Sequence, residues 1–255
     1  MESAKRNFWR IAILEVLVFG LLIAIYAIEK ALGMGEIAQI VVQEVILFGL
    51  FFGLNYFWIK QPVKLGTTVS FGKLVLIAVP FIIILLYMLL IFLAPHSRHT
   101  VTLAIVSGLG AGIFEEYLFR GIILGMLLKA FPKSSKTRTI WYSVVLSSFL
   151  FGVTHASNFF AQSISTTLMQ MISAWSIGFL LAALYLRSGS IILPMLFHSA
   201  WDCTSFLLSG STFVTSTVTT AAPVQAIGGL VLFLLIAAFY FRRSKISQID
   251  LKHFA

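Results

Sequence analysis

Long apolar runs follow one another along most of this chain, and they limit it to one broad class of fold. A helix needs about 20 mostly apolar residues to cross the hydrocarbon core of a bilayer. Eight runs approach or exceed that length, and they lack the alternation typical of membrane barrel strands. We therefore predict an all-α, polytopic membrane protein, a bundle of eight transmembrane helices. Their expected ranges are 11–28, 37–59, 74–93, 101–128, 140–160, 167–186, 191–208 and 224–241.

Composition agrees with a location in the lipid bilayer. Of the 255 residues, 59% are hydrophobic and 11% are charged, whereas soluble domains carry roughly 25% charged residues. The net charge of +9 does not indicate nucleic-acid binding, because the basic residues lie between the apolar runs. A single cysteine, Cys203, leaves no intramolecular disulfide to form. Without an internal repeat or linker, residues 1–255 are expected to form one transmembrane helical domain.

The basic residues also predict an orientation. Fifteen of the eighteen lysines and arginines fall before the first helix, after the last one, or in every second loop. The loops on the cytoplasmic side of a membrane protein carry the excess of such residues, so we expect both termini to be cytoplasmic. The Ser/Thr-rich stretch 209–220 would then be an outer loop.

A pair of adjacent glutamates and an arginine interrupt the fourth apolar run. Glu116 and Arg120 are four residues apart, so they share a helical face and can form an ion pair. Glu115 is rotated by about 100° around the helix and stays available. Each charged group at the centre of a bilayer costs about 2.5–3.5 kcal/mol on the insertion scale, and such groups mark functional sites by default. Seen alone, the three residues are equally consistent with a cluster that only packs helices together.

Two further runs each bring a histidine into the membrane. Phe151 and His155 share a face of the fifth helix, and His198 and Asp202 share a face of the seventh. Each histidine alone is also explained by hydrogen-bonded packing. Ionisable groups on three separate helices are costly unless they meet, so we predict that they converge on one site. Two Gly-xxx-Gly spacings in the fourth run, at residues 108/112 and 121/125, predict close helix contacts there.

These three pieces, Glu115-Glu116-xxx-Arg120, Phe151-xxx-His155 and His198-xxx-Asp202, occur in this order on separate membrane helices. They resemble the pattern of the CAAX prenyl protease and bacteriocin-processing family, also called the Abi family. The motif-bearing core spans about 101–208, and the eight-helix layout is also that of the family. The resemblance implies an intramembrane endopeptidase whose partners are the lipid bilayer and a peptide or prenylated-protein substrate. Compact length and short loops favour a bacterial cell membrane.

The resemblance also implies roles for the residues. Glu115 and His155 would activate a water molecule, and His198 and Asp202 would stabilise the oxyanion. Glu116 and Arg120 would form a structural ion pair. An ionised Asp202 cannot donate a hydrogen bond, so here it is expected to orient His198. We expect no cofactor, although two histidines and a glutamate also form a known catalytic zinc set; the chain has no His-Glu-xx-His segment.

Other protease classes fit the sequence poorly. An aspartyl protease needs two membrane aspartates, and the only other aspartate, Asp250, lies in the tail. Ser199 and Cys203 lack the context of a nucleophile, and Cys203 is read as a small buried residue. Glu15 and Glu44 are membrane acids without a motif, which we interpret as interfacial or packing groups.

Two non-enzymatic functions stay open at the level of sequence. The acidic and histidine side chains are also suited to a proton or ion path in a transporter or accessory subunit. Transporters are typified by repeated halves or broken helices, and the sequence shows neither. The other function is that of an immunity protein that binds a membrane-active bacteriocin peptide, a role associated with some family members.

Overall fold

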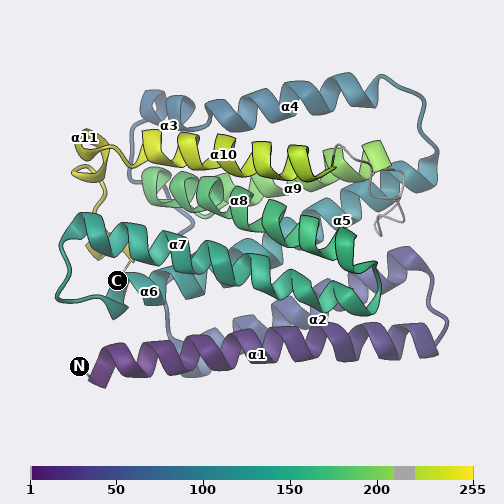
Figure 1. The fold of residues 1–255 in the computed structure, drawn as a ribbon, viewed down its shortest axis with the longest axis horizontal. Helices are drawn as coiled ribbons and strands as arrows, with labels where there is room; N and C mark the ends of the chain where they lie inside the picture. The colour runs from purple at the N-terminus through teal and green to yellow at the C-terminus, as the bar shows by residue number, and fades with distance from the viewer. Residues whose placement is uncertain (1, 210–221, 255) are drawn as a thin grey trace.

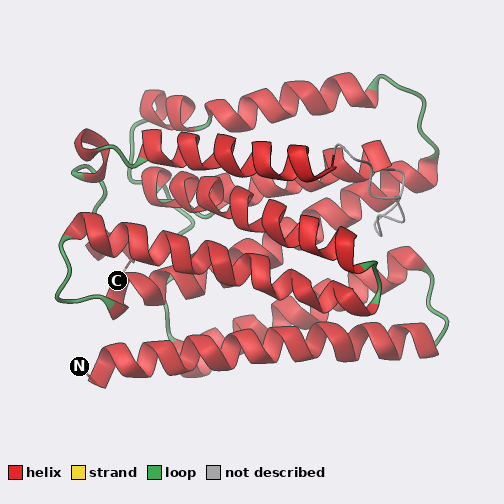
Figure 2. Ribbon diagram, in the orientation of Figure 1, coloured by secondary structure: helices red, strands yellow, loops and turns green. Residues whose placement is uncertain are grey.

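The computed structural model describes residues 2–209 and 222–254, so the predicted outer loop 209–220 falls outside it apart from its first residue. The described residues form a bundle of helices joined by short loops, and no strand occurs among them (Figures 1 and 2). The α-helices are α1 (Glu2–Ala31), α2 (Glu36–Leu54), α3 (Phe71–Ile77), α4 (Val79–Phe92), α5 (Arg98–Glu116), α6 (Gly125–Ala130), α7 (Lys136–Thr154), α8 (Ile164–Ser188), α9 (Ile192–Ser209), α10 (Ala222–Tyr240) and α11 (Arg243–Ile246). Tighter or wider helical segments are Asn55–Ile59 and Tyr117–Leu124 (both π) and His155–Phe160 and Leu251–Phe254 (both 3₁₀).

The chain is a multi-pass membrane protein, as predicted. Five helical stretches of the described residues are long and apolar enough to cross a bilayer, and a sixth is added if a bent pair counts as one span. The five are Ala4–Ala31, Glu36–Ile59, Arg98–Ala130, Lys136–Phe160 and Ile164–Ser188. Ile227–Tyr240 is a shorter apolar helix. The all-helical fold is therefore confirmed, while the number of eight crossings stays a prediction.

The bent pair corrects one expectation. Where the sequence predicts a single helix over 74–93, α3 and α4 meet at an angle of 60°. Pro80 is at the start of α4, and its ring removes a backbone hydrogen bond to the preceding turn. The sequence interpretation that the chain contains no broken helix was thus wrong. The apolar run hides the break because the residues on both sides of it are equally hydrophobic.

The centre of the bundle is α8. Every residue from Ser176 to Ser188 is buried, as expected of a helix that is surrounded by others. α8 packs against α7 and α10, and Figure 1 shows it between them. The neighbouring helices present their remaining apolar surface to the outside, in keeping with a lipid environment.

The start of α1 and the C-terminal segment lie at the same end of the bundle (Figure 1). Basic side chains from the start of α7 and the end of α8 meet the C-terminal segment there. Arg187 donates a hydrogen bond of 2.6 Å to the carbonyl oxygen of Lys245, and Lys136 donates one of 3.0 Å to that of Ser247. The concentration of cations at this end is the basis for proposing that it faces the cytoplasm.

Glycines allow α9 to lie directly against α5. A Cβ atom on Gly108 would come within 2.6 Å of the carbonyl oxygen of Ser199, and one on Gly112 within 2.7 Å of the Ser199 amide nitrogen. The prediction of a close helix contact is confirmed for this pair. Gly121 and Gly125 are equally crowded, but by the side chains of the loop residues Val63 and Gln61, so there the close neighbour is a loop.

Candidate active site

The charged residues of the fourth run lie where α5 passes into the π-helical segment. Glu115 and Glu116 are the last two residues of α5, and Arg120 belongs to the wider turn that follows. Arg120 Nη1 lies 2.9 Å from Glu116 Oε1, and both side chains are fully buried. The ion pair that the four-residue spacing indicates is therefore present.

His198 connects this pair to the other two carboxylates. Its Nδ1 lies 3.0 Å from Glu116 Oε1, and its Nε2 lies 3.6 Å from both Glu115 Oε2 and Asp202 Oδ2. When both ring nitrogens carry hydrogens, each N–H has a carboxylate acceptor beside it. The side chains of Glu115 and Asp202 are 23% exposed, in contrast to the fully buried ion pair. A ligand can therefore reach these two carboxylates, while Glu116 and Arg120 support them from behind.

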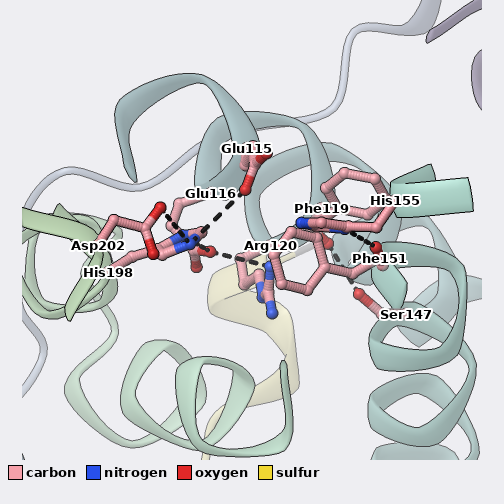
Figure 3. A network of polar contacts seen from close by, with 9 residues as sticks. All are labelled: Glu115, Glu116, Phe119, Arg120, Ser147, Phe151, His155, His198 and Asp202. Carbon is pink, nitrogen blue, oxygen red and sulfur yellow. Dashed lines mark hydrogen bonds and ion pairs between the residues drawn. The ribbon is translucent and has the colours of Figure 1, made fainter. Parts of the chain in front are cut away.

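Phe151 links His155 to the same cluster. Its ring makes edge-on contacts with both imidazoles, with centroid distances of 5.0 Å to His155 and 5.6 Å to His198. The guanidinium carbon of Arg120 lies 4.4 Å from the ring centroid, a distance typical of a cation–π contact. Figure 3 shows the phenyl ring between the histidines, with Glu115 above them. The three motif segments thus lie together, although no hydrogen bond joins His155 to Glu115 within the described part of the chain.

The state of the His155 ring follows from its hydrogen bond. Its Nδ1 lies 2.8 Å from the carbonyl oxygen of Phe151. Because a carbonyl oxygen can only accept, Nδ1 must be the donor and carry the hydrogen. In the neutral ring the lone pair is then on Nε2, which is the nitrogen needed to accept a proton.

A serine that the sequence did not single out supports this arrangement. Ser147 Oγ donates a hydrogen bond of 2.9 Å to the carbonyl oxygen of Phe119, in the π-helical segment. The ring of Phe119 in turn packs against that of Phe151 at 5.1 Å. Ser147 precedes Phe151 by four residues, so its place on the motif face of α7 was the available signal. It ties α7 to the wide turn that carries Arg120.

A further carboxylate, that of Glu44, approaches the cluster from α2. The side chain lies along α5, with its Cγ 2.6 Å from the position that a Cβ on Gly110 would take. Its Oε2 is buried and makes no hydrogen bond to a described residue. The carboxylate interacts electrostatically with Asp202 and His198. Its contact with Gly110 agrees with the interpretation of Glu44 as an interfacial or packing group.

An apolar pocket lies on another face of α5. Its volume is about 620 Å³, and its walls come from α2, α5, α9, both π-helical segments and the loop before α3, including Leu109, Ile113 and Tyr117. These three residues recur at four-residue spacing, whereas Glu115 is about 200° around the helix from Ile113. Hence the pocket is separate from the polar cluster, and the exposed edges of Glu115 and Asp202 are the accessible part of the site.

Histidine, cysteine and acidic side chains are the residues that could hold a metal ion in this protein. Across residues 2–209 and 222–254, no group of three or more His, Cys, Asp or Glu side chains is arranged to hold one. In the cluster, His198 Nε2 lies 3.6 Å from both Glu115 Oε2 and Asp202 Oδ2.

Comparison with known proteins adds an independent line of evidence. Residues 97–204 match the family described as Rce1-like, type II CAAX prenyl endopeptidase. This part of the chain is similar to the CAAX prenyl endopeptidase family. The matched segment runs from the residue before α5 into α9 and contains all three motif segments. No curated protein and no solved structure matches the chain.

Proposed function

We propose that this protein is an intramembrane endopeptidase that hydrolyses a peptide bond with a water molecule activated by Glu115 and His155. The observation that carries the proposal is the convergence of carboxylates and imidazoles from α5, α7 and α9 around His198 and Phe151. Peptide hydrolysis requires a base for the water and donors for the developing oxyanion, and both kinds of group are present in this cluster.

Each residue has a role that agrees with its surroundings. The partly exposed carboxylate of Glu115 accepts a proton from water, with the free Nε2 of His155 as the second acceptor. The water oxygen attacks the scissile carbonyl, and an N–H of His198 donates to the tetrahedral oxygen. Asp202 orients His198, because an ionised carboxylate has no hydrogen to donate. The proton taken from water then goes to the leaving amine as the C–N bond breaks.

Glu116 and Arg120 hold this arrangement without touching the substrate. They are fully buried, and Glu116 Oε1 lies within 3.0 Å of both Arg120 Nη1 and His198 Nδ1. Glu116 thereby fixes the His198 nitrogen that faces away from Asp202. The pair is assigned a structural role at the site.

The substrate is proposed to be a membrane-associated peptide or a prenylated protein, and the setting a bacterial cell membrane with both termini cytoplasmic. The membrane location and the family support a substrate that enters from the bilayer or its surface. The substrate class is tested with a library of peptides, half of them lipidated, offered to the protein in lipid nanodiscs. Mass spectrometry identifies any products.

Substitution of Glu115 by glutamine separates the enzymatic function from the two others. A protease loses cleavage by at least a hundredfold while its thermal unfolding stays unchanged. If the protein is an immunity protein, the Glu115→Gln variant keeps its peptide binding. If the protein forms a proton path, the variant loses proton conduction, and the wild type shows no peptide cleavage. Glu29→Gln is the matched control, because Glu29 is a buried carboxylate of α1 and does not belong to the cluster. Cleavage that is abolished by a chelator and restored by zinc would refute the metal-free mechanism.

A further inference from the structure

A carboxylate of α1 is hydrogen-bonded to the residue that precedes His155. Thr154 Oγ1 lies 2.6 Å from Glu15 Oε1, and 3.1 Å from the carbonyl oxygen of Leu150 in the preceding turn. Thr154 is buried, with 6% of its surface exposed. The two partners are 139 residues apart in the sequence, so this bond joins the first helix to the end of α7.

The position of Glu15 within the membrane gives its hydrogen bond to Thr154 energetic weight. It lies in the middle of the apolar stretch Ala4–Ala31, where an ionisable side chain is expensive and is normally found with a partner. Its other oxygen, Oε2, is buried and makes no hydrogen bond to a described residue. The Thr154 hydroxyl is the hydrogen-bond donor to its carboxylate. A leucine at position 15 would pack among lipid chains without the cost of burying an ionisable group.

Thr154 is also the point at which the helix changes its geometry. α7 ends at Thr154, and the chain continues as a 3₁₀ segment that begins with His155. The direction of the His155 ring depends on the backbone at this junction. One side of the ring is held by its own bond to Phe151, and the Glu15–Thr154 bond holds the backbone immediately before it. α1 packs against both α7 and the 3₁₀ segment.

We propose that Glu15 and Thr154 act as positioning residues that aim His155 at the reacting water. This inference rests on the proposed function, in which His155 accepts a proton from that water. Neither residue touches the substrate; they act through the junction between α7 and the 3₁₀ segment. Because an error of about 1 Å in a reacting group can cost 100-fold in rate, a partial loosening of His155 is expected to cost about tenfold.

The test uses variants that differ only in hydrogen bonding. Thr154→Val has nearly the shape of threonine but no hydroxyl, and Thr154→Ser keeps the hydroxyl. Glu15→Met removes the acceptor, and Glu15→Gln keeps an amide oxygen that can accept from Thr154. Glu29→Met is the matched control, since it replaces another buried carboxylate of α1. Cleavage of the peptide found in the library experiment gives kcat and KM, and tryptophan fluorescence gives the unfolding temperature.

We expect Thr154→Val and Glu15→Met each to lower kcat about tenfold with KM unchanged, and the double variant to be no worse than either. Thr154→Ser, Glu15→Gln and Glu29→Met should stay within about twofold of the wild type. A purely structural bond would instead lower the unfolding temperature and leave kcat of the folded protein unchanged, which overturns the inference. Effects that multiply in the double variant overturn it as well. If Glu115→Gln cleaves as well as the wild type, the proposed function itself fails. If Glu115→Gln is inactive but Thr154→Val is fully active, only the positioning role of Glu15 and Thr154 is refuted.

Discussion

Gly112 lies where α5 and α9 pack backbone against backbone, a few residues from Glu116 on one helix and His198 on the other. A Cβ atom at this position would lie 2.7 Å from the Ser199 amide nitrogen and 3.0 Å from the Met195 carbonyl oxygen, and closer still to Ser199 Oγ. An ordinary contact begins at about 3.4 Å. In the variant Gly112→Ala, α9 must therefore move away from α5 by about 0.7 Å, the difference between 3.4 and 2.7 Å.

That movement is large compared with the tolerance of the site. The distance between His198 Nδ1 and Glu116 Oε1 is 3.0 Å, and adding about 0.7 Å takes it beyond the range of a hydrogen bond. Overpacking of this kind costs about 1–3 kcal/mol of stability. Displacement of His198 is expected to lower kcat by about 10- to 100-fold.

The assay is peptide cleavage by purified protein in nanodiscs, with thermal unfolding measured on the same samples. Gly53→Ala is the control, because a Cβ atom on this glycine of α2 meets nothing within 4 Å; it should behave as the wild type. Adding Ser199→Ala to Gly112→Ala should not restore activity, because the backbone atoms of α9 still obstruct the methyl group. Full activity of Gly112→Ala would refute the claim that the α5–α9 spacing sets the geometry of the site.

Substitutions at three further positions test the supporting groups. Arg120→Ala leaves Glu116 buried without its cation and should lower the free energy of unfolding by about 3–5 kcal/mol; a chemical-denaturation curve that matches the wild type would contradict the structural role of the pair. Phe151→Leu removes the edge-on contacts to the histidines, each worth about 0.5–1.5 kcal/mol, and should reduce kcat more than it changes KM in steady-state cleavage. Asp202→Asn should keep at least a tenth of the wild-type activity, because the amide can still orient His198. Asp202→Ala should fall below that level. Equal activity of the two variants would argue against an orienting role for Asp202.

The sequence predicted the features that follow from short-range geometry and from the cost of charge in a membrane. Helical spacing is enough to pair Glu116 with Arg120, because residues four apart share a face. The high cost of isolated ionisable groups is enough to expect that His198 meets Glu115. Both arguments depend on neighbouring positions or on the bilayer, and they need no knowledge of the packing of distant helices.

Which side chains pair outside the three motif segments could not be predicted in this way. Glu15 and Thr154 lie 139 residues apart, and nothing local in either helix points to the other. Glu44 reaches the cluster only because Gly110 leaves room beside α5. The break before α4 also escaped the sequence analysis, although Pro80 at the start of α4 was an available signal; the apolar residues on both sides of it continue as one run.

The π-helical segment Tyr117–Leu124 has a consequence for comparing this chain with its relatives. In a π-helix each backbone hydrogen bond spans one residue more than in an α-helix, so the segment holds surplus residues within a continuous rod. Removing one of them would let the wide turn tighten towards an α-helix, and Gly125 would keep nearly the same direction towards Gln61, because the wide turn had absorbed the extra residue. A one-residue gap in an alignment of homologues at this place therefore marks the loss of the wide turn and not a rotation of the helix beyond it, so the side-chain correspondences on both sides of the gap are kept.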